Sequence, residues 1–116
     1  MQRTMLKSKI HRATVTQANL YYEGSITVDA KLIRAADILE HEKVEVLNLN
    51  NGRRIETYCI KGKPDSGVVC LNGPAARGAC LGDQVIIVSY VLVEDKQAKS
   101  IKPKIIKVNA RNQIKD

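Results

Sequence analysis

Asn51 and Gly52 lie between two stretches that both have the composition of β-strands. Val44–Asn50 precedes the pair and Arg54–Lys61 follows it, and both stretches are rich in aliphatic residues. An Asn-Gly pair between two such stretches is the strongest short-range signal for a β-hairpin, because both residues tolerate the positive φ angles of a tight turn. We therefore predict a hairpin over residues 44–61.

The rest of the chain predicts further short strands and two short helices. One helix is expected at Ala30–Leu39 with Asp29 as its N-cap, and the other is opened by Asn72-Gly73-Pro74. Six or seven short strands form a small closed β-barrel economically, because closure removes exposed strand edges. The fold class is therefore mainly β, in a single domain of residues 1–116. The additional strands are predicted at Lys7–Thr16, Ser25–Val28, Val68–Leu71, Gln84–Val93 and Lys104–Val108.

Composition argues against several classes of protein. No apolar run approaches the roughly 20 residues that cross a bilayer, and the first seven residues lack the apolar stretch of a secretory signal. The cysteines Cys59, Cys70 and Cys80 are odd in number and have no C-x-x-C spacing, so neither a disulfide framework nor a zinc site is expected. A protein of the reducing cytoplasm, without a metal site and not bound to a membrane, fits best.

The net charge of +7 allows two interpretations of the basic segment at residues 96–116. The segment could bind nucleic acid, or it could be a solvated basic end. All four aromatic residues are Tyr, so a platform for stacking bases is poorly supplied and the second interpretation is favoured. The basic residues concerned are Lys96, Lys99, Lys102, Lys104, Lys107, Arg111 and Lys115.

Two strand faces could form a pocket for a small anion. Arg54 and Tyr58 share one face of their strand, and Lys9 and His11 share a face of the first strand with Ala13 and Val15. Arg, Lys, His and Tyr together suit a ligand with two carboxylates, since Arg binds carboxylates in a bidentate manner. Spacing alone favours the alternative that they are surface residues of a basic protein.

Several motifs nevertheless occur together in a specific order and spacing, and together they resemble the aspartate 1-decarboxylase family. The resemblance extends from about Met1 to Glu94 and is weakest in the basic segment that follows. The motifs are Met5–Ala13, Tyr22–Asp29 with its Gly24-Ser25 pair, Asn51–Arg54, Thr57-Tyr58, Leu71–Arg77 and Gly82–Ile87.

The resemblance implies a double-psi β-barrel that assembles as a homotetramer, with active sites between neighbouring subunits. It also implies a proenzyme, in which the hydroxyl of Ser25 attacks the carbonyl of Gly24 and the acyl group moves from nitrogen to oxygen. Elimination then leaves dehydroalanine, which hydrolyses to a pyruvoyl group and ammonia. The expected fragments are residues 1–24 and 25–116, and Thr57 is expected to help stabilise the oxyanion. The sequence leaves open whether an accessory maturation protein takes part.

The implied reaction converts L-aspartate to β-alanine and CO2, a step towards pantothenate and coenzyme A. The pyruvoyl group made from Ser25 would form a Schiff base with the substrate, in the role that pyridoxal phosphate has elsewhere, and neither that cofactor nor a metal is expected. Tyr58 matches the proton donor to Cα. The implied substrate-binding residues are Lys9, His11, Arg54, Thr57 and the loop Asn72, Gly73, Pro74 and Ala75.

Two details depart from a simple picture of this site. Pro74 stands where many relatives have Ala, and proline has no N–H to donate. Strict alternation places Thr57 on the strand face opposite Arg54 and Tyr58, so a bulge or a second pocket wall is needed. Two other hypotheses stay open at this point: a non-enzymatic barrel that binds nucleic acid as an intact chain, and a family member that does not cleave itself and acts as a scaffold.

Overall fold

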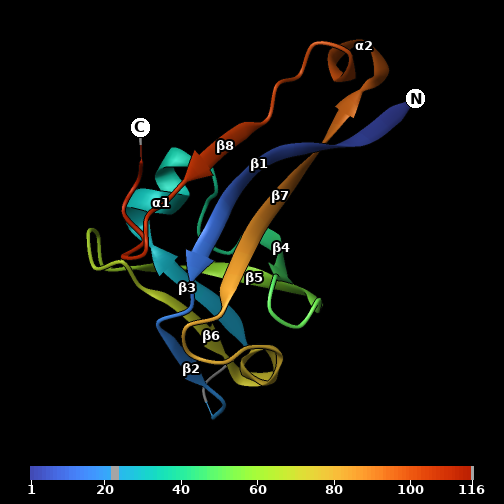
Figure 1. Cartoon of the computed structure of the whole chain (residues 1–116). Helices are drawn as coiled ribbons and strands as arrows, with labels where there is room; N and C mark the ends of the chain where they lie inside the picture. Colours follow the sequence, from blue (N-terminus) through green and yellow to red (C-terminus); the bar gives the residue numbers. More distant parts are fainter. Residues whose placement is uncertain (22–23, 116) are drawn as a thin grey trace.

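A computed structural model describes residues 1–21 and 24–115, which form a mainly β fold (Figure 1). Tyr22 and Glu23, which begin the second motif, lie outside the described residues. The helices are α1 (Ala30–Ala35), α2 (Asp95–Ala98) and the 3-10 helix η1 (Gly73–Gly78). The strands are β1 (Gln2–Thr14), β2 (Gln17–Asn19), β3 (Ser25–Asp29), β4 (Lys43–Asn48), β5 (Arg54–Gly62), β6 (Val69–Asn72), β7 (Gln84–Glu94) and β8 (Lys104–Lys107).

The eight strands form one sheet in the order β2-β6-β3-β5-β4-β7-β1-β8. The predicted hairpin is confirmed, because β4 and β5 pair antiparallel and Gly52 in their connection has a φ of +75°. The chain that leaves β1 reaches the other end of this order, where the backbone N–H of Thr16 donates to the carbonyl of Val69 in β6 at 2.9 Å. Strands far apart in the strand order are thereby brought together, as the prediction of a barrel requires.

Alternating aliphatic residues build the core. Helix α1 covers it with Leu32 and Ile33, and the carboxylate of Asp29 accepts a hydrogen bond from the backbone N–H of Lys31, which confirms the predicted N-cap. The helix ends at Ala35, earlier than predicted, because Asp37 adopts a left-handed φ of +57° that a helix cannot continue through. Alternate buried positions on the strands include Ile26 and Val28, Val44 and Val46, and Val85 and Ile87.

Strand β1 does not keep a single alternation along its length. Its register against β7 shifts between Ile10 and Ala13, and Arg12 in this interval has a φ of +64°. The bulge turns Ala13 into the core, whereas Lys9 stays on the partly exposed face. The prediction that Lys9 and His11 share a face with Ala13 and Val15 is therefore wrong for the last two.

The N-terminal part of β1 and the C-terminal part of β7 project from the body of the molecule as a two-stranded ribbon (Figure 1). Helix α2, which the sequence did not predict, lies at the tip of this ribbon. No helix in residues 1–21 and 24–115 combines the length and the apolar character needed to cross a membrane.

The basic C-terminal segment takes part in the sheet through β8 and in buried contacts through Asn112. Strand β8 pairs in parallel with β1, and Asn112 is 2% exposed. The Asn112 side chain accepts a hydrogen bond from the N–H of Thr14 at 2.7 Å and donates to the carbonyls of Thr14 and Gly67, each at 2.8 Å. The interpretation as a solvated end holds for the lysine side chains, which are exposed, but is wrong for the backbone that carries them.

Replacing Asn112 with alanine should lower the free energy of unfolding by about 2–4 kcal/mol, because three hydrogen bonds are lost and buried backbone groups are left without partners. Urea unfolding followed by circular dichroism measures this change. Arg111→Ala is the matched control, since the Arg111 side chain is exposed. Equal stability of the two variants would contradict a structural role for the segment.

Candidate active site

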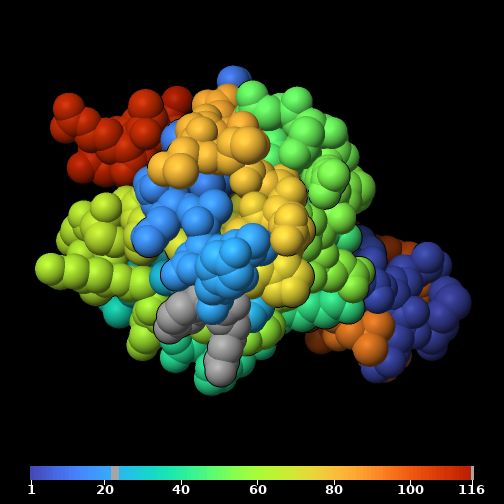
Figure 2. Space-filling model, turned by 90° about the horizontal axis from the view of Figure 1, so that it is seen from below, coloured from blue at the N-terminus to red at the C-terminus, as the bar shows by residue number. Residues whose placement is uncertain are grey.

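A cavity of about 400 Å³ opens between β5, η1 and the residue that precedes β3. Figure 2 views this end of the molecule, where the yellow η1 segment lies between the light-blue chain before β3 and the green β4–β5 hairpin. We call the cavity of about 400 Å³ the inner cavity. Its lining residues are Gly24, Arg53, Ile55, Glu56, Thr57, Tyr58, Pro74, Ala75 and Gly78.

Ser25 lies directly after Gly24, at the start of β3, and is completely buried. Its Oγ accepts a hydrogen bond from Nδ2 of Asn72 at 2.8 Å, and the same amide donates to Oγ1 of Thr27 at 2.9 Å. The pairing of β3 with β6 places Ser25 opposite Asn72. Because Oγ of Ser25 acts as an acceptor here, the proton of its hydroxyl remains available to another group.

The amide of Asn72 is itself held in place from behind. Its Oδ1 accepts a hydrogen bond from Sγ of Cys70 at 3.2 Å. Burial raises the pKa of the Cys70 thiol above its ordinary value, so the thiol keeps the proton that it donates. The orientation of the Asn72 side chain, with its NH2 group towards Ser25, is therefore defined by partners on both sides.

The loop after Asn72 packs against Gly24. Gly73, the first residue of η1, has a φ of +60°, a left-handed conformation that glycine adopts without strain, and Pro74 follows it in the first turn. Cδ of Pro74 lies 3.5 Å from the position that a side-chain Cβ at residue 24 would take. Pro74 and Ala75 line the inner cavity, so the loop forms one of its walls.

Thr57 and Tyr58 both line the inner cavity although they point to opposite faces of β5. The register between β4 and β5 is unbroken over these residues, so no bulge is present. Strand β3 pairs with β5 only from Cys59 onwards. Before Cys59, one edge of β5 therefore has no neighbouring strand among the described residues. The inner cavity lies at this edge and contacts both faces of β5, through Thr57 on one face and Tyr58 on the other. This arrangement corresponds to the second pocket wall expected above.

Tyr58 is 37% exposed, and its ring packs edge-to-face against His41 with 6.5 Å between the ring centroids. An aromatic pair at this separation and angle is favourable. Its hydroxyl forms no hydrogen bond within the described part of the chain. The ring of Tyr58 is therefore fixed on one side while its hydroxyl is free to meet a bound molecule.

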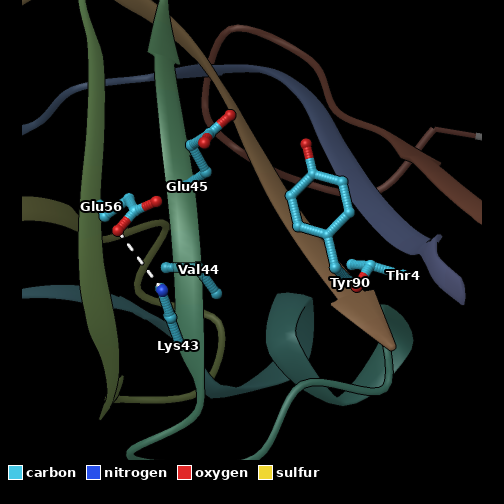
Figure 3. Close-up of a pocket in the computed structure, with 6 residues that line it drawn as sticks. All are labelled: Thr4, Lys43, Val44, Glu45, Glu56 and Tyr90. Atoms are coloured by element: carbon cyan, nitrogen blue, oxygen red, sulfur yellow. Dashed lines mark ion pairs between the residues drawn. The ribbon is translucent and has the colours of Figure 1, made fainter. Parts of the chain in front are cut away.

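Arg54 lies on the same strand face as Tyr58 but does not line the inner cavity. Its Nη2 donates to Oε1 of Glu45 at 2.6 Å. Glu45 lines a second cavity of about 300 Å³, which we call the outer cavity; Figure 3 shows Glu45 and Glu56 on adjacent strands with Tyr90 facing them from β7. Glu56 lines both cavities, so the two meet on the face of β5 that carries Arg54.

Lys9 and His11 lie elsewhere in the chain, on β1 between β7 and β8. Neither lines the inner or the outer cavity. Burial lowers the pKa of His11 below its ordinary value, and nearby cations lower it further: Lys9, Arg12, Lys107 and Lys115. Near neutral pH His11 therefore offers a neutral imidazole, which can form a hydrogen bond but adds no positive charge.

The structure thus brings together Gly24, Ser25, Thr57, Tyr58 and the loop of residues 72–75, with Arg54 close by. It does not bring Lys9 and His11 to the same place within one chain. Sequence reasoning missed Glu45, although a hairpin register that places Leu47 opposite Arg54 also places Glu45 diagonally across from it. No cluster of three or more His, Cys, Asp or Glu side chains suited to a metal ion occurs among the described residues.

Comparison with known proteins gives a match over almost the whole chain. A family model described as aspartate decarboxylase matches residues 1–115. The aspartate 1-decarboxylase of Syntrophus aciditrophicus is 59% identical over 115 residues, which cover 99% of each protein. The chain belongs to the aspartate decarboxylase family. The aspartate 1-decarboxylase of Campylobacter fetus is 55% identical over 116 residues covering both chains completely, and that of Listeria monocytogenes is 56% identical over 114 residues, 98% of this chain and 90% of its own.

Membership of the aspartate decarboxylase family confirms the resemblance drawn from the motifs. The match also extends past Glu94, where the motifs were weakest, and includes β8 and Asn112. The fold of this family is the double-psi β-barrel, which agrees with the mainly β sheet described above. The basic C-terminal segment is therefore a regular part of the family's domain.

Proposed function

We propose that this chain is an aspartate 1-decarboxylase that converts L-aspartate to β-alanine and CO2, and so supplies the pathway to pantothenate. The similarity to enzymes with this name supports the reaction. The observation that carries the proposal is the buried Ser25, whose Oγ is held by Asn72 next to a cavity lined by Thr57 and Tyr58.

We propose that the chain first cleaves itself between Gly24 and Ser25. The Oγ of Ser25 forms a bond to the carbonyl carbon of Gly24, and the bond from that carbon to the Ser25 nitrogen breaks, which gives an ester and a free amino group. Loss of the Cα proton of residue 25 and of the Gly24 carboxylate from its Cβ then separates the two parts, and hydrolysis of the remaining dehydroalanine releases ammonia and leaves a pyruvoyl group. Thr57 lines the inner cavity, and the resemblance to the family assigns its hydroxyl as the donor to the oxygen that becomes negative. The resulting fragments are residues 1–24 and 25–116.

The surroundings of position 25 fit the pyruvoyl group that this cleavage leaves. In that group the carbonyl oxygen comes from water and is attached to Cα, while Oγ leaves with the Gly24 carboxylate. The NH2 group of Asn72, which donates to Oγ of Ser25 before cleavage, would then be free to donate to the new carbonyl oxygen beside it. When present, the group supplies an electrophilic carbonyl that withdraws electrons from the amino-bearing carbon of the substrate. The chemistry therefore requires neither pyridoxal phosphate nor a metal ion.

The other residues bind the substrate and move a proton. Arg54 pairs with a substrate carboxylate, and Tyr58 holds the proton that is delivered to Cα. The loop of residues 72–75 forms the wall behind the substrate; Gly73 and Ala75 carry backbone N–H groups there, whereas Pro74 has none.

Lys9 and His11 are proposed to contact the substrate from a second copy of the chain. Within one chain they lie on β1, away from both cavities, so the site needs another subunit to include them. This separation supports active sites between subunits, and the resemblance to the family implies that the assembly is a homotetramer. Lys9 would add positive charge, and the neutral His11 would add a hydrogen bond.

The test is to incubate the purified protein with L-aspartate and to measure β-alanine and CO2. The denatured protein is weighed by intact mass spectrometry, and native mass spectrometry counts the subunits. We expect β-alanine and CO2 in equal amounts, two fragments in place of the 12.9 kDa chain, and a tetramer. A persistent single chain that forms no β-alanine and binds polyanions in a salt-dependent way would instead support a nucleic-acid-binding barrel.

A further inference from the structure

The residue proposed to bind a substrate carboxylate already binds a carboxylate of the chain itself. Nη2 of Arg54 and Oε1 of Glu45 lie 2.6 Å apart, a short charge-assisted hydrogen bond. The two partners differ in exposure, since the side chain of Arg54 is 62% exposed and that of Glu45 only 19%. Glu45 is thus the more enclosed member of the pair, and Arg54 is the member that faces solvent.

The hairpin explains why Glu45 lies where it does. Arg54 pairs with Leu47 across the two strands, and Glu45 is two residues from Leu47 on the same face, which is the diagonal position that long side chains reach. The neighbouring Glu56 is committed elsewhere, because it pairs with Lys43 at 3.3 Å (Figure 3). Glu45 is therefore the carboxylate assigned to Arg54 on this face.

One hydrogen bond to Glu45 leaves most of the guanidinium unused. A guanidinium has several N–H donors arranged as a fork, and within residues 1–21 and 24–115 the Arg54 side chain bonds only to Glu45. A long arginine side chain loses much rotamer freedom when it is ordered, and an arginine that is ordered before the ligand arrives avoids that loss on binding. The remaining donors can then receive a carboxylate without rearrangement.

We propose that Glu45 is a positioning residue, which holds the Arg54 guanidinium ready for the carboxylate of aspartate. The inference rests on the proposed function, because it takes Arg54 as a substrate ligand. The negative charge of Glu45 opposes the substrate, but charges near the surface interact weakly through water, so the ordering of Arg54 is the larger effect.

Steady-state kinetics with L-aspartate tests this role. For Glu45→Ala we expect KM to rise about three- to ten-fold, the range for one side chain that must be ordered on binding, with kcat and the extent of self-cleavage unchanged. Glu45→Gln keeps an acceptor at the same place and should bring KM back to within about two-fold of the unmodified protein. If both variants lower KM, Glu45 is a competitor of the substrate; if neither changes KM, it has no role in positioning. Either result overturns the proposal.

A double-mutant cycle shows whether Glu45 acts through Arg54. In the Arg54→Ala background, Glu45→Ala should leave KM unchanged, since no guanidinium remains to be held. A further rise in KM would contradict the proposal. Failure of the proposed function is distinguishable: an unmodified protein that makes no β-alanine refutes the activity, and an Arg54→Ala variant with normal KM refutes the role of Arg54.

Asp65→Asn is the matched control for the loss of one negative charge. Asp65 forms an exposed ion pair with Lys31 at 3.2 Å, and it lines neither the inner nor the outer cavity. Its KM should equal that of the unmodified protein. A rise like that of Glu45→Ala would assign the effect to overall charge and overturn the positioning role.

Discussion

The Ser25→Ala variant is expected to remain a single chain of 12.9 kDa and to form no β-alanine. Alanine has no hydroxyl to attack the carbonyl of Gly24, and it cannot become the electrophilic group that the reaction needs. Both steps therefore fail at once, and the expected loss of activity is complete. Intact mass spectrometry after prolonged warming measures the cleavage, and an assay for β-alanine measures the turnover.

Ser25→Ala should nevertheless fold. The variant loses one hydrogen bond, and Asn72 keeps its bonds to Thr27 and Cys70, so the change in stability is about 1 kcal/mol. Ser89→Ala is the matched control, because Ser89 is also completely buried and its hydroxyl bonds to one other side chain, Ser8, at 2.6 Å. The control should cleave normally. Two fragments from Ser25→Ala would refute self-cleavage by the Ser25 hydroxyl.

Local sequence signals predicted those parts of the fold whose cause is local. The turn at Asn51-Gly52 and the N-cap at Asp29 depend on residues within a few positions, and both are confirmed. The face reversal in β1 could not be predicted in this way. It depends on Arg12 adopting a positive φ within a pairing to β7, a strand more than seventy residues further along the chain.

The prediction that the C-terminal segment is a solvated end was wrong for a similar reason, because it depends on contacts between residues that are distant in sequence. The lysine-rich composition of the segment is typical of a solvated end. The hydrogen bonds that hold it in place join Asn112 to Thr14 and Gly67, which are distant in sequence. The short strand β2 was likewise not predicted, because three residues are too few to show an alternating pattern and β2 is defined by its pairing with β6.

The candidate site likewise contains some contacts that depend on local sequence and others that depend on long-range strand pairing. Arg54 and Tyr58 share a face by simple alternation, and the hairpin register places Glu45 beside Arg54. The contact of Ser25 with Asn72 requires the pairing of β3 with β6, which no local pattern encodes. Only the resemblance of several motifs in order connected these residues before their positions were known.

The Tyr58→Phe variant is expected to cleave itself normally and to lose most of its turnover. Phenylalanine keeps the ring that packs against His41 but removes the hydroxyl, so the geometry of the cavity is preserved while the proposed proton donor is lost. A positioned acid or base contributes about 10²–10⁴-fold to a rate. We therefore expect kcat to fall by at least about 10²-fold, as measured by β-alanine formation on fully cleaved protein.

Self-cleavage of Tyr58→Phe serves as an internal control. If the variant yields both fragments, its loss of activity lies in the decarboxylation and not in maturation. Tyr90→Phe is the matched control, since Tyr90 lies on β7 and does not line the inner cavity. Normal β-alanine production by Tyr58→Phe would refute the role of Tyr58 as proton donor. Together with Ser25→Ala, the variant separates the two proposed kinds of chemistry at one site: the hydroxyl of Ser25 is proposed to act once, on its own backbone, and the hydroxyl of Tyr58 is proposed to act in every turnover.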